Sequence, residues 1–129
     1  MKFQLHPEAR QELERARRYY RARDGEVARR FAREVLEVFE RVARSPLQFP
    51  KHGLLAITTK TGPLFFDVYK AVLPRTFPYV VLFFVRANTA IVLAVAHGKR
   101  RPGYWIARTK EQHPTVRPKT AGKARGGGG

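Results

Sequence analysis

The stretch that decides the fold is a pair of apolar runs, YVVLFFVR at residues 79–86 and AIVLAVA at residues 90–96. Nearly every residue in both runs is apolar, which is typical of central strands buried on both faces of a sheet. Ala87-Asn88-Thr89 separates them, and so short a connection predicts a hairpin. The second run leads directly into HGKRRPGYW, residues 97–105, so cations and aromatic rings collect where the last strand ends. We therefore expect the functional residues at this end of the sheet.

The sequence upstream predicts a short strand over residues 3–5, followed by two helices. Pro7 suits the first turn of the first helix, because its missing N–H would be unsatisfied there. One face of this helix carries apolar residues at helical spacing, namely Ala9, Leu13, Ala16 and Tyr20. Asp24-Gly25 ends it, a second amphipathic helix is expected over residues 26–44, and Ser45-Pro46 ends that one. Two helices joined by so short a turn must pack antiparallel.

The region between the helices and the apolar hairpin is less regular. Glycine and proline mark residues 51–63 as a long connection, which we expect to hold one short strand at 54–59. A further strand is expected at residues 65–73. Helices that precede a run of strands indicate the α+β class. We predict an N-terminal strand and an antiparallel helical hairpin packed on a small, twisted, mostly antiparallel sheet.

Charge sets limits on the partners. The 129-residue chain has a net charge of +16, so a polyanionic or acidic protein partner is expected. Residues 109–129 carry a net +4 and little to bury, so we expect a disordered basic, Gly-rich tail behind a domain at residues 1–108. That domain keeps a net +12 of its own.

Composition also excludes several chemistries. The chain has no cysteine, which rules out disulfides, thiolate zinc sites and a cysteine nucleophile. Histidines and carboxylates show no metal-ligand spacing, so no metal and no cofactor is expected. No apolar run approaches the roughly 18 residues of a membrane span, and the start of the chain has no signal-like apolar segment. We expect a cytoplasmic protein without a membrane partner.

The residues after the last strand suggest a contact surface. Arginine planes and aromatic rings can stack on nucleobases while the charges contact phosphates. The candidate contact residues are Lys99, Arg100, Arg101, Tyr104, Trp105 and Arg108. The alternative is that Tyr104 and Trp105 fold back onto the sheet as a hydrophobic lid, which leaves the cations in solvent.

Candidates for acid–base chemistry are few. Histidine is the side chain type that titrates near neutral pH, and His97 lies beside the cationic patch, so it is either a general acid or base or a histidine held by a hydrogen bond to a neighbour. His6 is assigned to the start of the first helix. The acidic residues are expected at solvated helix positions, which argues against a paired-carboxylate hydrolase. Asp67 is the exception, and we assign it either to a strand edge or to a salt bridge.

Several motifs in a fixed order resemble the RelE/ParE toxin superfamily of type II toxin–antitoxin modules. They span residues 1–108 and comprise Pro7-Glu8-Ala9, Tyr19-Tyr20, Ser45-Pro46, Phe77-Pro78-Tyr79 and the HGKRRPGYW segment with Arg108. The resemblance implies the small toxin fold described above. It also implies an acidic antitoxin partner and therefore a hetero-oligomer.

The superfamily has two activities, and the resemblance assigns different residues to each. RelE-like members cut mRNA on the ribosome with Lys and Arg side chains and a C-terminal Tyr, and here Lys70, Arg100 and Tyr104 match parts of that set. Val80 stands where these interferases look to carry an Arg. ParE-like members lack the set and poison DNA gyrase, and the YW-x-x-R ending is more similar to theirs.

We therefore expect a ParE-like toxin that binds and inhibits DNA gyrase without catalysis. The first alternative is a ribosome-dependent mRNA interferase, in which Lys70, Arg75 or Arg100 would stabilise phosphate charge and His97 or Tyr104 would move the proton. The second alternative is a basic nucleic-acid-binding domain without toxicity.

Overall fold

The computed structural model describes residues 1–100, 103–106 and 108, and the expected tail at 109–129 lies outside these residues. Its elements follow one another in the order β1 (Lys2–Leu5), α1 (Pro7–Arg23), α2 (Gly25–Arg44), a 3₁₀ turn (Pro46–Gln48), β2 (Lys51–Thr59), β3 (Gly62–Val72), β4 (Tyr79–Arg86) and β5 (Thr89–His97). The predicted element order is confirmed.

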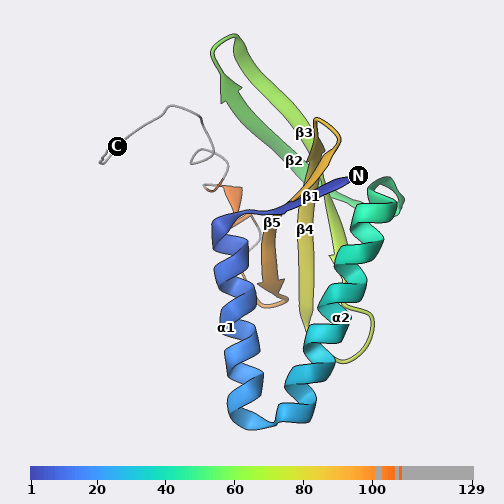
Figure 1. Cartoon of the computed structure of the whole chain (residues 1–129). Coiled ribbons are helices and arrows are strands. Elements are labelled where there is room, and N and C mark those ends of the chain that lie inside the picture. The colour runs from blue at the N-terminus through green and yellow to red at the C-terminus, as the bar shows by residue number, and fades with distance from the viewer. Residues whose placement is uncertain (101–102, 107, 109–129) are drawn as a thin grey trace, which may run out of the picture.

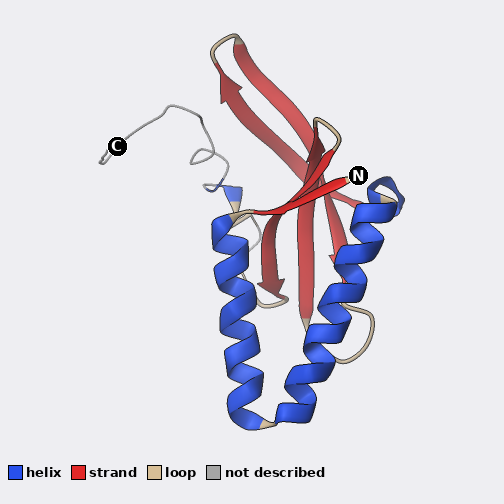
Figure 2. Cartoon of the chain, in the orientation of Figure 1, coloured by secondary structure: helices blue, strands red, loops and turns tan. Residues whose placement is uncertain are grey.

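The five strands form one sheet in the order β1-β5-β4-β3-β2. β1 pairs with β5 in parallel, whereas the other three pairings are antiparallel. Both helices lie against one face of this sheet, and they diverge from their shared turn (Figure 1). Figure 2 separates the helical layer from the strand layer and shows the predicted α+β architecture.

A single aspartate ends one helix and starts the next. The backbone N–H of Asp24 donates to the Tyr20 carbonyl at the end of α1. Its side-chain Oδ1 accepts hydrogen bonds from the N–H groups of Glu26 at 2.8 Å and Val27 at 3.4 Å. Because one residue caps both helices, the turn is as short as the sequence predicts, and the helices are antiparallel.

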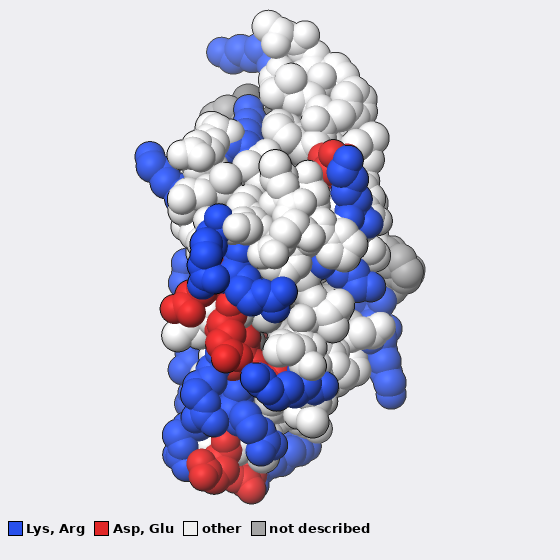
Figure 3. Space-filling view, turned by 90° about the vertical axis from the view of Figure 1, so that its right-hand side faces the viewer, with Lys and Arg blue, Asp and Glu red and all other residues white. Residues whose placement is uncertain are grey.

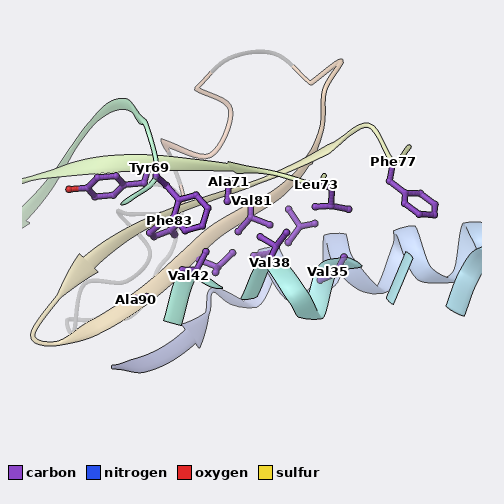
Figure 4. Close-up of a cluster of buried hydrophobic side chains, with 14 of the residues drawn as sticks. Val35, Val38, Val42, Tyr69, Ala71, Leu73, Phe77, Val81, Phe83 and Ala90 are labelled. Carbon is purple, nitrogen blue, oxygen red and sulfur yellow. The ribbon is translucent and has the colours of Figure 1, made fainter. Parts of the chain in front are cut away.

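The main hydrophobic core lies between the helices and the sheet. Figure 4 shows Val35, Val38 and Val42 of α2 facing Val81 and Phe83 of the sheet. All five side chains are 3% exposed or less. The helical spacing of the valines therefore marks the face of α2 that binds the sheet.

A second core covers the opposite face of the sheet. It contains Leu82 and Phe84 of β4, Leu93 of β5 and, from the C-terminal segment, Trp105. The pairing of β4 with β5 shifts between Leu82 and Phe83, so β5 carries one extra residue at this point. This β-bulge sends Leu93 and Ala94 to the same face, and it explains how an unbroken apolar run serves both cores.

The segment at residues 51–63 differs from the prediction. Instead of a loop with one short strand, it forms β2 and the start of β3, which join through a tight turn at residues 60–61 and pair over most of their length. The resulting β2–β3 hairpin projects beyond the end of the helices (Figure 1). Its outer face includes Leu54 and Phe65, which are 62% and 61% exposed.

The exposed hairpin is largely free of charge. In Figure 3 the end of the molecule formed by the hairpin is mostly uncharged, whereas arginines and glutamates alternate over the helical part. No helix in the described part of the chain is long and apolar enough to cross a membrane.

Candidate functional site at the end of β5

A buried carboxylate organises the end of β5. Glu12 of α1 is 7% exposed, and its Oε1 accepts a hydrogen bond from the backbone N–H of Val95 at 2.9 Å. The guanidinium of Arg108 donates to both carboxylate oxygens, from Nη1 to Oε1 at 2.9 Å and from Nη2 to Oε2 at 2.8 Å. The hydroxyl of Tyr104 donates to Oε2 at 2.5 Å. Glu12 therefore ties the C-terminal segment to α1 and β5.

The sheet edge explains why the network forms here. β1 pairs with β5 only as far as Val92, so beyond that residue β5 has no strand on this side. Unpaired N–H and C=O groups at a buried edge need other partners. Glu12 takes the N–H of Val95, and Nη1 of Arg108 donates to the carbonyl of Leu93 at 2.9 Å.

The sequence analysis missed Glu12, because it placed the acidic residues at solvated positions. That expectation is also wrong for Glu34, which is 1% exposed. A signal for Glu12 was present in the spacing of Ala9, Glu12 and Ala16, which puts all three on one face of α1. Glutamate is usually a surface residue, so its type did not indicate that Glu12 lies on the buried face.

Burial and the Glu12 network keep the hydroxyl of Tyr104 protonated. Its pKa is raised far above the usual value, first by burial and then by the hydrogen bond to Glu12 and the charge of that carboxylate. Arg100 lies over its ring, with Cζ 3.9 Å from the ring centre. Burial alone would lower the pKa of Arg108, but the hydrogen bond and the charge of Glu12 outweigh it, so the pKa is raised.

A cleft of about 230 Å³ opens beside this network on the face of the sheet away from the helices. We call it the strand-end cleft, and its lining includes Lys70 of β3, His97 of β5, and Arg100 and Tyr104 of the segment that follows. These are four of the five residues assigned to the interferase alternative, and the fifth, Arg75, does not line the cleft. Val80 lines the same cleft, so the position without a cation faces it directly.

His97 is partly buried and hydrogen-bonded. Its Nδ1 accepts the backbone N–H of Lys99 at 3.1 Å, so the neutral ring carries its proton on Nε2. Its ring also packs edge-on against Tyr79, with centroids 5.3 Å apart. This is the structural alternative considered for His97, and it leaves Nε2–H as the remaining donor of the ring.

The proposed contact residues divide into two groups. Lys99 and Arg100 are exposed, and Arg101 lies outside the described residues. Trp105 and Arg108 are 4% and 6% exposed, which corrects the expectation that they contribute to a contact surface. Trp105 packs in the second core, so it forms the hydrophobic lid named as the alternative.

Three other assignments have clear outcomes. His6 starts α1 as expected, because its Nδ1 accepts the N–H of Glu8 at 3.1 Å. Its Nε2 lies 3.2 Å from the Arg108 carbonyl, to which the protonated nitrogen donates. Asp67 pairs with Lys51 at 3.4 Å, as predicted. Arg75 lies outside the strand-end cleft and pairs with Glu37 of α2 at 3.3 Å.

Comparison with protein families connects this geometry with a known class. Residues 3–102 match the model of the ParE toxin of the type II toxin–antitoxin system parDE. The chain belongs to the ParE toxin family. The match covers α1, α2 and all five strands except for Lys2, the first residue of β1. It confirms the resemblance to the ParE-like branch, and it makes this chain the toxin component of a module whose second component is an antitoxin.

Neither the comparison with curated proteins nor the comparison with solved structures found a match. The family assignment therefore rests on the sequence model and on a fold that agrees with it. Membership in a toxin family favours a toxin over the second alternative, a basic domain without toxicity.

Proposed function

We propose that this toxin arrests growth by binding DNA gyrase, and that it does so without catalysing a reaction. The observation that carries the proposal is the hydrogen bond of 2.5 Å from the Tyr104 hydroxyl to Glu12. To act as a general base, Tyr104 would first have to lose its own proton near the working pH, and burial together with Glu12 opposes this ionisation.

The surrounding residues support the same conclusion. Arg108 is committed to Glu12 and Leu93, so its guanidinium cannot contact a transferring phosphate. Val80 supplies no charge to the strand-end cleft. Of the described candidate contact residues, Lys99 and Arg100 are exposed. Two exposed cations are suited to the contact surface of a binding protein, but they do not make a complete catalytic set.

The experiment is to induce the chain in bacteria and pulse-label DNA and protein synthesis within minutes. A gyrase poison stops DNA synthesis first, and the purified toxin should then inhibit supercoiling by purified gyrase. Arg100→Ala combined with Arg101→Ala should abolish both effects, while Arg18→Ala combined with Arg21→Ala, on the exposed surface of α1, should leave them unchanged.

One observation favours the mRNA interferase as a second candidate. The strand-end cleft gathers Lys70, His97, Arg100 and Tyr104, which provide cations for a phosphate and a histidine for proton transfer. In that case translation should stop first, with cleaved mRNA.

Two variants separate the candidates. Tyr104→Phe and His97→Gln should each lower mRNA cleavage by about 10²-fold or more if these groups transfer protons. A gyrase-binding toxin should remain active in both variants, provided that circular dichroism shows them to be folded.

A further inference from the structure

A second cleft lies on the other side of His97 and Arg100. It has a volume of about 560 Å³ and opens between α1 and the adjoining ends of β4 and β5. We call it the helix cleft, and its polar lining consists of Arg15, Tyr19, Tyr20, Tyr79, His97 and Arg100, with Glu12 at one side. Its size is in the range of ligand-binding pockets.

The polar groups of the helix cleft are almost all hydrogen-bond donors. Neither the Tyr20 nor the Tyr79 hydroxyl is hydrogen-bonded to another described residue, and burial raises the pKa of both, so both keep their protons. His97 presents Nε2–H, because its Nδ1 is occupied by the N–H of Lys99. Glu12 is the one carboxylate in the lining, and Val95, Tyr104 and Arg108 already occupy its oxygens.

The charges of the cleft are also unbalanced. Within the described residues no ion pair involves Arg15 or Arg100, and the guanidinium of Arg100 lies over the ring of Tyr104. Two guanidinium groups therefore flank neutral donors, with Ala16 and Val95 among the apolar lining. Such a site is complementary to an acceptor with a single negative charge on an apolar stem.

We propose that the helix cleft receives an acidic side chain, Asp or Glu, from a segment of the antitoxin. A carboxylate fits this lining better than a phosphate dianion, because most of the donors are neutral and the walls are aromatic and aliphatic. The net charge of +16 favours an acidic partner over the whole surface. The proposal rests on the antitoxin partner of the family and does not depend on the target of the toxin.

The test uses the full-length chain and its cognate antitoxin. Arg15→Glu places a negative charge in the mouth of the cleft, and Arg18→Glu makes the same change on the exposed surface of α1, outside the cleft. We expect Arg15→Glu to weaken antitoxin binding at least tenfold and Arg18→Glu to weaken it less than threefold. Because both residues are exposed in the middle of one helix, circular dichroism should show both variants folded.

Growth and binding readouts separate this proposal from the one above. Arg15→Glu should still arrest growth, but co-expressed antitoxin should no longer neutralise it. A Glu→Arg or Asp→Arg change in the antitoxin that restores binding to Arg15→Glu would identify the inserted side chain.

Three results would overturn the proposal. The first is equal weakening by Arg15→Glu and Arg18→Glu, which would indicate general electrostatic attraction. The second is antitoxin binding that neither Arg15→Glu nor the combination Tyr20→Phe with Tyr79→Phe changes. The third is loss of oligonucleotide binding in Arg15→Glu while antitoxin binding is kept, which would assign the cleft to nucleic acid.

Discussion

At the scale of the residue, Glu12 has the largest structural role. One carboxylate accepts hydrogen bonds from a strand backbone, a tyrosine and an arginine, and it lies on the helix that faces them. The desolvation of Glu12 and Arg108 is compensated only while both are present. The C-terminal segment therefore depends on a residue almost one hundred positions upstream.

Glu12→Gln should lower the free energy of unfolding by about 3–5 kcal/mol, because it leaves Arg108 buried without its counter-charge. The measurement is urea unfolding followed by circular dichroism. Glu14→Gln is the control, since Glu14 pairs with Arg17 at 3.0 Å on the surface and its loss should cost about 1 kcal/mol or less. Equal losses in both variants would show that the Glu12 network contributes no more than a surface pair.

Trp105→Ala tests the lid in the same way. Removing this side chain from the second core should cost about 3–5 kcal/mol. Leu47→Ala, at a position that is 69% exposed, should cost well under 1 kcal/mol. If Trp105→Ala lost no more free energy of unfolding than Leu47→Ala, the ring would be available to a partner, as the contact-surface interpretation required.

At the scale of the element, the junction of β1 with α1 makes stability depend on pH. Burial lowers the pKa of His6 below its usual 6.5, and this effect outweighs the hydrogen bond to the Arg108 carbonyl. Just below pH 6.5, His6 therefore binds a proton in the unfolded chain, whereas in the folded chain it binds one only at a lower pH. The stabilisation by neutral His6 is complete above about pH 6.5 and is lost as the pH falls through the folded-state pKa.

We expect the free energy of unfolding to fall from pH 7.5 to pH 5.5, and to fall less in His6→Asn. Asparagine keeps an acceptor for the N–H of Glu8 but does not titrate. His52→Asn, at an exposed position of β2, should retain the full pH dependence. A His6→Asn curve parallel to that of the unmodified chain would exclude His6 as the source.

The β2–β3 hairpin has one buried and one exposed face, and neighbouring residues test this directly. Leu55→Ala should cost about 2–5 kcal/mol, because its side chain is 1% exposed in the second core. Leu54→Ala, at 62% exposure, should cost under about 1 kcal/mol. Chemical unfolding of the two variants would reveal a register shifted by one residue, because such a shift would exchange the two results.

At the scale of the whole molecule, charge repulsion opposes the folded state. Residues 1–108 carry a net charge of +12, and among the described ion pairs only Arg108–Glu12 has both side chains buried. Salt shortens the range of repulsion from about 10 Å at 0.1 M to about 3 Å at 1 M, while buried pairs are screened much less.

We therefore expect the thermal midpoint to rise by a few degrees between about 0.1 M and 1 M sodium chloride, measured by the fluorescence of Trp105, the only tryptophan. Antitoxin binding should weaken over the same range, because its attraction is electrostatic. A midpoint that falls with salt would mean that surface ion pairs contribute more than repulsion costs.

The sequence by itself determined the fold class, the order of the elements and the family. These follow from local periodicity and short turns: residues 79–85 and 90–96 are apolar throughout, and Asp24 joins two amphipathic helices through contacts within four residues. His97, Arg100 and Tyr104 lie near one another because they end or closely follow the last strand, whereas only the family resemblance grouped Lys70 with them.

Only the tertiary structure decided which polar residues are buried and which aromatic rings are accessible. Glu12 and Arg108 lie 96 positions apart in the sequence, and both are residue types usually found on the surface. They are buried here because the edge of β5 supplies a backbone hydrogen-bond partner for each of them. From the sequence alone, Trp105 suits a partner contact as well as a buried position. The bulge at Leu93 decides between the two, because it turns apolar side chains toward the face of the sheet that Trp105 covers. Local pattern cannot determine such pairings, because the desolvation that governs them depends on elements far apart in the chain.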